Sequence, residues 1–144
     1  MKILFVEGNE DHRETATIHL RTKKHQVDHY VPKESVSGNW GDVPTFSDEN
    51  DLTQLLDEEK YDAAILDRET FREGQPERSF LPKYLRSVIE SGYKGNIVVT
   101  STMPEDHLSE ELAEFRQNIT IVQKAYLIEE LVSGLEAGYR PKTL

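Results

Sequence analysis

The chain has 144 residues, which is enough for one domain with its own hydrophobic core. It contains no cysteine, which excludes disulfide scaffolds, thiol nucleophiles and thiolate metal sites and is consistent with a reducing compartment. Acidic residues outnumber basic ones 27 to 17, and the formal charge of -10 argues against nucleic acid or an anionic membrane surface as a partner.

The N-terminal segment carries one lysine followed by a short apolar run at residues 3–6. This run is too short for the core of a signal peptide, and no apolar run in the sequence approaches the roughly 20 residues of a membrane span. We therefore expect the mature chain to begin at Met1 and to be cytoplasmic.

Short apolar runs predict the strands. Four of them are nearly continuous and rich in β-forming residues, as in parallel strands that are covered on both faces; they are residues 3–6, 63–66, 97–99 and 119–122. A weaker run with alternating apolar residues, 26–31, predicts a fifth strand nearer an edge of the sheet.

Between these runs, apolar residues at helical spacing predict five helices, at residues 11–24, 51–59, 80–91, 104–116 and 127–137. We expect Asn9 or Asp11 to cap the first helix and Asp51 to cap the second. Strands that alternate with helices predict an α/β fold, a single doubly wound (flavodoxin-like) sheet of five parallel strands with helices on both faces.

This domain is expected to cover residues 1–138, followed by a tail at 139–144 and no output domain. Two connections are long: residues 32–50 are rich in Pro, Gly, Ser and Asn, and residues 68–78 are highly charged. Loops of this length in a compact domain are often functional. Trp40, in the first of them, is expected either to fill its own loop or to serve as an exposed docking residue.

Polar side chains follow four of the predicted strands, at the edge where open α/β sheets bind ligands. Glu7 follows the first strand, and Asp67, Thr100 and Lys124 follow the third, fourth and fifth. This set suits phosphoryl transfer to a carboxylate, because a cation such as Mg²⁺ neutralises the crowded oxygens while a hydroxyl and an ammonium hold the others. The sequence has no glycine-rich phosphate-binding motif, which argues against a nucleotide or flavin domain.

The sequence resembles the receiver domains of two-component response regulators over residues 1–138. The matching segments are KILFVEGNEDHR, YDAAILD, NIVVTS and IVQKAYLIEELVSGLEAG. The resemblance implies the strand order 2-1-3-4-5. It also implies that Asp67 is the phosphoryl acceptor, that Thr100 and Lys124 assist it, and that Glu7 and Asp67 hold Mg²⁺.

Several positions depart from the receiver pattern. Gly8 stands where the family has its second acidic metal ligand, so we expect weak Mg²⁺ binding. Ala125 replaces the proline that follows the lysine in the family, and Ile121 replaces the aromatic switch residue. The segment after Asp67 lacks the usual Met-Pro turn.

The resemblance implies a stand-alone receiver domain, which is a regulatory domain rather than an enzyme. It would accept a phosphoryl group at Asp67 from a histidine kinase or phosphotransfer protein. It would signal to a downstream protein, or form a homodimer, through the face of the fourth helix, fifth strand and fifth helix. The alternative is a phosphorylation-independent pseudo-receiver that binds a partner in a fixed conformation. A small hydrolase is a weaker alternative, because the sequence presents no base beside a nucleophile.

Overall fold

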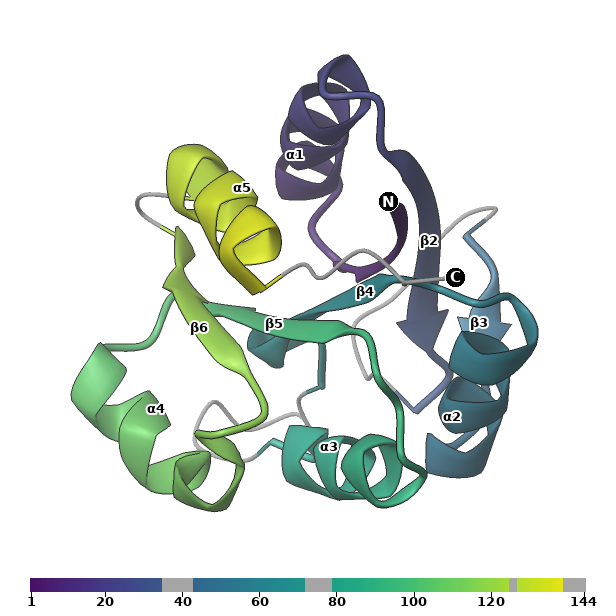
Figure 1. Ribbon diagram of the computed structural model, residues 1–144. Coiled ribbons are helices and arrows are strands. Elements are labelled where there is room, and N and C mark those ends of the chain that lie inside the picture. Colours follow the sequence, from purple (N-terminus) through teal and green to yellow (C-terminus); the bar gives the residue numbers. More distant parts are fainter. Residues whose placement is uncertain (35–42, 72–78, 125–126, 139–144) are drawn as a thin grey trace.

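A computed structural model describes residues 1–34, 43–71, 79–124 and 127–138, and it shows one parallel sheet with helices on both faces (Figure 1). The strands are β1 Lys2–Val6, β2 Gln26–Pro32, β3 Thr45–Phe46, β4 Ala63–Asp67, β5 Asn96–Ser101 and β6 Thr120–Gln123. The helices are α1 Glu10–Thr22, α2 Glu49–Glu58, α3 Leu81–Glu90, α4 Glu105–Glu111 and α5 Leu127–Gly138, with two short 3₁₀ helices, η1 Arg68–Phe71 and η2 Ala113–Phe115.

The sheet has six strands in the order β3-β2-β1-β4-β5-β6, so the predicted count of five was wrong. The additional strand, β3, lies inside the segment that we expected to be a loop, and it pairs in parallel with the end of β2, Val31 with Thr45 and Pro32 with Phe46. Two residues are too few to show an alternating pattern, so only the pairing with β2 identifies this strand. Because β3 adds to an edge, the five expected strands remain neighbours in the order β2-β1-β4-β5-β6.

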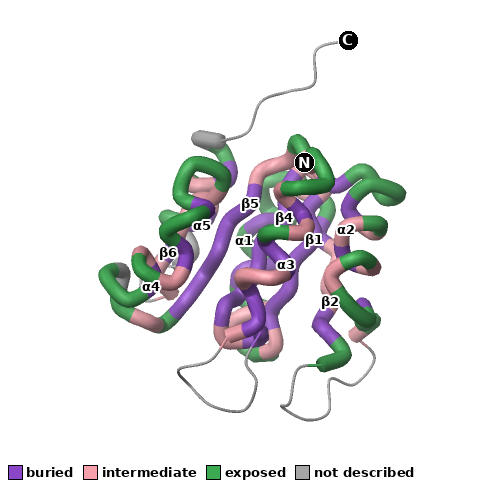
Figure 2. Tube along the Cα trace, turned by 90° about the horizontal axis from the view of Figure 1, so that it is seen from below, coloured by how far each residue is buried: buried purple, intermediate pink, exposed green. Residues whose placement is uncertain are grey.

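Two apolar layers cover the sheet, one on each face. Leu4 and Val6 of β1 face the layer that contains residues of α2, α3 and α4, whereas Ile3 and Phe5 face the layer that contains residues of α1 and α5. Figure 2 shows β1, β4 and β5 as mostly buried tubes in the centre and the exposed positions on the outer sides of the helices. This burial on both faces explains why the strands are almost continuously apolar.

The N-terminal cap was predicted correctly for α1 but not for α2. Asn9 caps α1 as expected, since its side chain accepts a hydrogen bond from the His12 N–H at 3.0 Å. Asp51 is not the cap of α2. The cap is Asp48, which accepts from the Asp51 N–H at 2.9 Å, while the Asp51 carboxylate accepts from the Ser47 N–H at 2.7 Å. This reciprocal arrangement resembles a capping box, and it starts the helix two residues earlier than predicted.

The fourth predicted helix, residues 104–116, is also divided. α4 ends at Glu111, and the 3₁₀ helix η2 follows it. Leu108, Leu112 and Phe115 remain buried, so the apolar spacing that predicted one helix is satisfied by two shorter elements.

The two long connections begin or end at a cluster of aromatic rings, formed by Phe46, Phe71, Phe80 and Tyr84. Their ring centroids are 5.1 to 6.2 Å apart. The first four residues of the charged connection 68–78 form η1 rather than a loop. Residues 35–42 with Trp40, residues 72–78, residues 125–126 and the tail 139–144 lie outside the described residues.

In the part of the chain that the structure describes, no helix combines the length and apolar character needed to cross a membrane.

We predict that the aromatic cluster is a main source of stability. Phe71→Ala removes a fully buried ring in contact with three others and should lower the free energy of unfolding by about 3 to 5 kcal/mol. Urea denaturation measures this change. Ile18→Ala is the control, because that side chain is 66% exposed and its loss should be nearly neutral. Equal effects of the two substitutions would contradict the role assigned to the cluster.

Candidate functional site

Three of the four predicted site residues meet at one edge of the sheet. Glu7 follows β1, Asp67 ends β4 and Lys124 follows β6. The Lys124 ammonium lies 3.0 Å from Glu7 Oε1 and 2.9 Å from Asp67 Oδ1. They meet because the strands are parallel, so that their carboxyl ends lie at the same edge.

The three side chains are almost completely shielded from solvent. Their exposed fractions are 1% for Glu7, 3% for Asp67 and 7% for Lys124. Charged groups are costly to bury without partners, so each must be balanced inside the protein. The ammonium between the two carboxylates supplies that balance.

Thr70, which sequence reasoning missed, completes the surroundings of Asp67. Its hydroxyl donates a hydrogen bond to Asp67 Oδ2 at 2.6 Å and accepts one from the Gly8 N–H at 2.8 Å. Thr70 is buried in η1, directly after β4. A hydroxyl three residues after a strand-end carboxylate was the available signal, but its use depends on η1, which the sequence did not predict. Thr70 thus links the predicted acceptor to the position of the missing second acid.

Thr100 lies close to this cluster but does not join its hydrogen bonds. In the register of β4 and β5 it is paired with Asp67, and it is 1% exposed. Its hydroxyl has no hydrogen-bond partner among the residues that the structure describes. The neighbouring Ser101 instead donates a hydrogen bond to Glu69 at 2.7 Å.

Protonation completes the charge balance. Burial raises the pKa of Glu7 to about 8, and Asp67 contributes in the same direction as a negative charge and as a hydrogen-bond partner, while Lys124 opposes both. Burial lowers the pKa of Lys124, but the charges of Asp67 and Glu7 outweigh it, so the net shift is upward and the ammonium stays charged. The raised pKa of Glu7 therefore favours its protonated form at neutral pH, while Lys124 stays charged.

This arrangement does not fit Mg²⁺. Magnesium prefers several oxygen ligands in octahedral geometry, usually including ionised carboxylates. Here the Lys124 ammonium lies within 3.0 Å of both carboxyl groups and takes up one oxygen of each. Among the described residues there is also no group of three or more His, Cys, Asp or Glu side chains that could hold a metal ion. The assignment of Glu7 and Asp67 as metal ligands stays a prediction.

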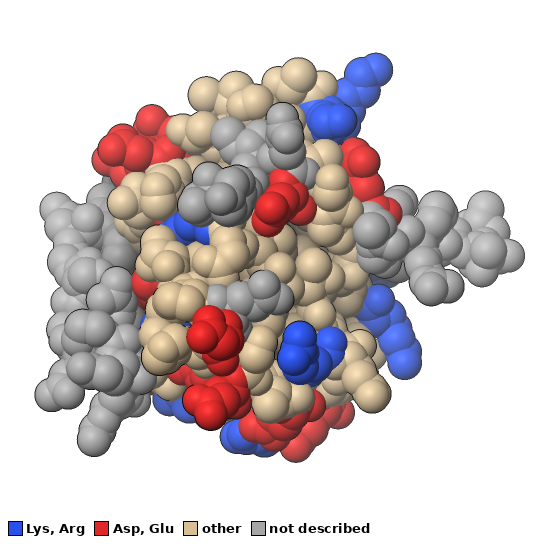
Figure 3. Space-filling view, turned by 90° about the vertical axis from the view of Figure 1, so that its left-hand side faces the viewer, with Lys and Arg blue, Asp and Glu red and all other residues tan. Residues whose placement is uncertain are grey.

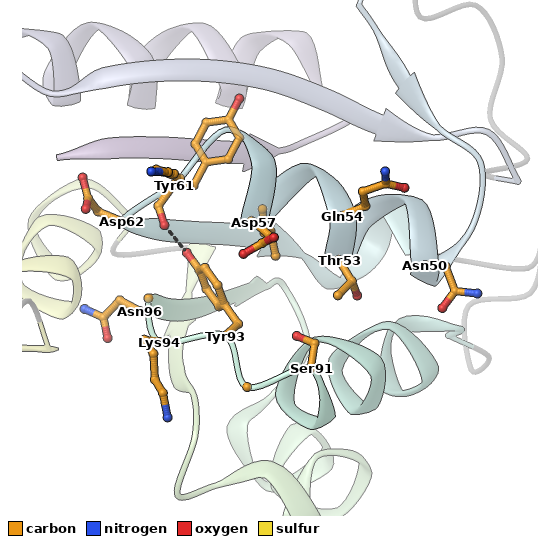
Figure 4. A pocket seen from close by; sticks show the side chains of 14 residues that line it. Asn50, Thr53, Gln54, Asp57, Tyr61, Asp62, Ser91, Tyr93, Lys94 and Asn96 are labelled. Atoms are coloured by element: carbon orange, nitrogen blue, oxygen red, sulfur yellow. Dashed lines mark hydrogen bonds between the residues drawn. The ribbon is translucent and has the colours of Figure 1, made fainter.

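Apart from this cluster, a hollow lies at the opposite edge of the sheet, between α2 and the C-terminal end of α3 (Figure 4). Its volume is about 910 Å³. Several of its polar groups already have partners inside the protein: the Tyr93 hydroxyl donates to the Tyr61 carbonyl at 2.9 Å, and the Asn96 amide donates to the Leu135 carbonyl at 3.0 Å. Most of its lining residues are polar, with Thr53 and Asp57 on one side and Ser91 and Tyr93 on the other, and we do not assign a function to it.

No protein-family model matches the chain, and no curated protein matches its sequence. Solved structures do match its fold. The BeF3-activated N-terminal receiver domain of RstA from Klebsiella pneumoniae is similar with a TM-score of 0.66 and 16% identity, covering 98% of this chain and 100% of that one.

The receiver domain of Francisella response regulator 1452 gives a TM-score of 0.63 at 12% identity, with 96% and 95% of the two chains covered. A two-component response regulator from Clostridium difficile gives 0.63 at 15% identity, with 96% and 94% covered. At such low identity the likeness establishes the fold. The chain therefore has the fold of response regulator receiver domains.

We predict that Glu7 makes the stability of the protein depend on pH. Because its folded pKa is about 8 and its ordinary value is 4.5, its stabilising contribution is complete below about pH 4.5. It is lost as the pH rises toward 8. Glu7→Gln removes this titration, so the stability of the variant relative to wild type should increase between pH 5 and about pH 8.

Urea denaturation at a series of pH values measures this difference. Glu14→Gln, at an exposed position of α1, serves as the control and should follow the wild-type profile. Parallel curves for wild type and Glu7→Gln would show that Glu7 does not retain its proton in the folded protein.

A further prediction concerns the cation of the cluster. Lys124→Met leaves Asp67 buried without its cation and should lower the free energy of unfolding by about 3 to 5 kcal/mol. Lys83→Met breaks an exposed pair with Glu34, which is 3.2 Å long, and should cost about 1 kcal/mol or less. Thermal denaturation compares the two variants. Similar losses in both would mean that burial does not strengthen the Lys124 pair.

Proposed function

We propose that this protein is a receiver-type regulatory domain of two-component signalling that acts as a phosphorylation-independent protein-binding module. The receiver fold supports the regulatory class. The observation that carries the proposal is the position of the Lys124 ammonium, which lies about equally close to Glu7 and Asp67. Its positive charge offsets the negative charge of the buried carboxyl groups.

The surroundings of Asp67 disfavour its use as a nucleophile. Attack on a phosphoryl group needs a free carboxylate oxygen in line with the incoming phosphorus. Oδ1 of Asp67 faces Lys124, Oδ2 accepts from Thr70, and the side chain is 3% exposed. The Lys124 ammonium is already shared between Glu7 and Asp67, so it is not free to meet an anionic phosphoryl donor. These contacts stabilise the unmodified carboxylate.

A partner would bind on the face formed by α4, β6 and α5. β6 is the edge strand of the described sheet, so its outer side leaves backbone groups available for pairing. Figure 3 shows this side of the molecule, where acidic side chains are dispersed among uncharged ones rather than gathered in one patch. Ile121 of β6 is partly buried there. A downstream protein is the occupant we propose, and a second copy of the chain is the alternative.

One observation favours a second candidate function, in which Asp67 accepts a phosphoryl group from a histidine kinase or phosphotransfer protein. The Thr100 hydroxyl is buried, is level with Asp67 in the sheet, and has no hydrogen-bond partner among the described residues. A phosphoryl oxygen on Asp67 would give it one. Both functions are expected in the cytoplasm, a compartment that the lack of cysteine also favours.

Labelling with acetyl phosphate separates the two functions. Wild type should be labelled slowly or not at all, whereas Gly8→Asp restores an acid at the edge of β1 and should speed labelling. We also expect this variant to bind Mg²⁺ about 5 to 150 times more tightly, as estimated from one added carboxylate near the ion. Gly8 has no positive φ, so its backbone should accept aspartate.

Intact-protein mass spectrometry measures the label, and calorimetry measures Mg²⁺ binding. Gly8→Asp combined with Asp67→Asn is the control, and it should not be labelled. If wild type is labelled on Asp67 as fast as Gly8→Asp, the phosphoryl acceptor is the correct function and the binding-module proposal is wrong.

A further inference from the structure

Hydrogen bonds join the residues that follow Asp67 in the chain to the residues that follow Thr100. These bonds are separate from the contacts of the Lys124 cluster. The Glu69 carboxylate accepts hydrogen bonds from the Ser101 hydroxyl at 2.7 Å, the Thr102 N–H at 2.5 Å and the Thr102 hydroxyl at 2.9 Å. The Ser101 hydroxyl also accepts from the Met103 N–H at 3.0 Å. Glu69 therefore attaches η1 to the segment that leaves β5 and enters α4.

The preceding residue, Arg68, holds the other end of α4. Its guanidinium donates to both carboxylate oxygens of Glu111, from Nε at 2.7 Å and from a terminal nitrogen at 3.1 Å. Arg68 is 2% exposed, so this pair is shielded from solvent. Such bidentate pairs are among the stronger and more directional contacts in proteins.

Glu111 is the last residue of α4, and the last turn of that helix has no basic residue of its own. A cation at this end is favourable for the helix dipole, and Arg68 supplies it from η1. α4 has only seven residues, which is too short to be stable by itself. Its position therefore depends on contacts with the rest of the protein.

We propose that Arg68 and Glu69 form a two-ended clamp that holds residues 101–111 in one position against η1. Glu69 binds the start of this segment through Ser101 and Thr102, and Arg68 binds its end through Glu111. The clamp fixes one side of the α4, β6 and α5 face without any modification of Asp67. The inference goes beyond the proposed function, because it concerns the mobility of α4 whatever role Asp67 has.

The 3₁₀ helix η1 also connects the clamp to the acidic site formed by Glu7, Asp67 and Lys124. Asp67 and Thr70 face Lys124 and Gly8, while Arg68 and Glu69, which lie between them in sequence, face α4 and its entry. η1 thus contributes Thr70 to the acidic site and Arg68 and Glu69 to the clamp. Breaking the clamp should release α4 while leaving the Lys124 cluster in place.

Hydrogen exchange of the free protein, followed by NMR, tests the clamp. Glu69→Ala should speed exchange at the Thr102 and Met103 amides and along α4 by about tenfold or more, the effect expected for losing hydrogen bonds to a charged group. Glu69→Gln should have a smaller effect, because its amide oxygen still accepts from the Thr102 N–H. Amides of β1 and β4 should exchange as in wild type.

Two further variants make the test specific. Glu111→Gln should speed exchange near the end of α4, since it weakens the contact with Arg68. Glu114→Ala is the control: Glu114 pairs with Arg86 at 2.6 Å in the same region, but both side chains are about half exposed, so exchange in α4 should not change.

Exchange in residues 101–111 that is unchanged by Glu69→Ala would overturn the proposal. An equal increase in β1 and β4 would also overturn it, because Glu69 would then stabilise the whole domain rather than hold one segment. The experiment uses neither phosphoryl donor nor metal ion. A failed clamp therefore leaves the binding-module proposal standing, and rapid labelling of wild-type Asp67 would refute that proposal without bearing on the clamp.

Discussion

One buried ammonium between two carboxyl groups is the constraint on which the rest of this site depends. Lys124 lies about 3 Å from both Glu7 and Asp67, and nearly all solvent is excluded from the three side chains. Lys124 supplies one positive charge to two buried carboxyl groups, and the His12 ring lies 3.5 Å from Glu7 at the edge of the cluster. Burial and the neighbouring Asp67 together raise the pKa of Glu7. The strands β1, β4 and β6 must end at the same level for the cluster to form, which links the chemistry of the site to the register of the sheet.

This balance explains why the site differs from one built around a metal ion. A divalent cation needs ionised oxygen ligands, and the position of a second acid at the end of β1 is taken by Gly8, whose N–H instead binds the Thr70 hydroxyl. In this structure a side chain of the domain itself, Lys124, provides a positive charge beside both carboxyl groups. A site that is shielded in the free protein holds one arrangement, and that suits a binding surface of constant shape.

The aromatic cluster and the Lys124 cluster are built from different residues, and both are expected to contribute to stability. The aromatic cluster, at the start of α3 and beside the short strand β3, extends the core layer that contains residues of α2, α3 and α4. η1 joins the regions, since Phe71 belongs to the aromatic cluster, Thr70 to the acidic site, and Arg68 and Glu69 to the contacts with α4. Four consecutive residues therefore contribute to three different surroundings.

The sequence by itself determined the five main strands, their α/β arrangement and the convergence of Glu7, Asp67 and Lys124. These follow from local apolar runs and from the rule that parallel strands end at one edge. The tertiary structure alone decided the strand β3, the choice of Asp48 over Asp51 as a cap, the break after α4 and the role of Thr70. It also decided that the Thr100 hydroxyl has no hydrogen-bond partner among the described residues and that burial raises the pKa of Glu7. The physical reason is that a hydrophobic pattern records which residues are buried, whereas hydrogen-bond partners and pKa values depend on groups that are distant in sequence and meet only after folding.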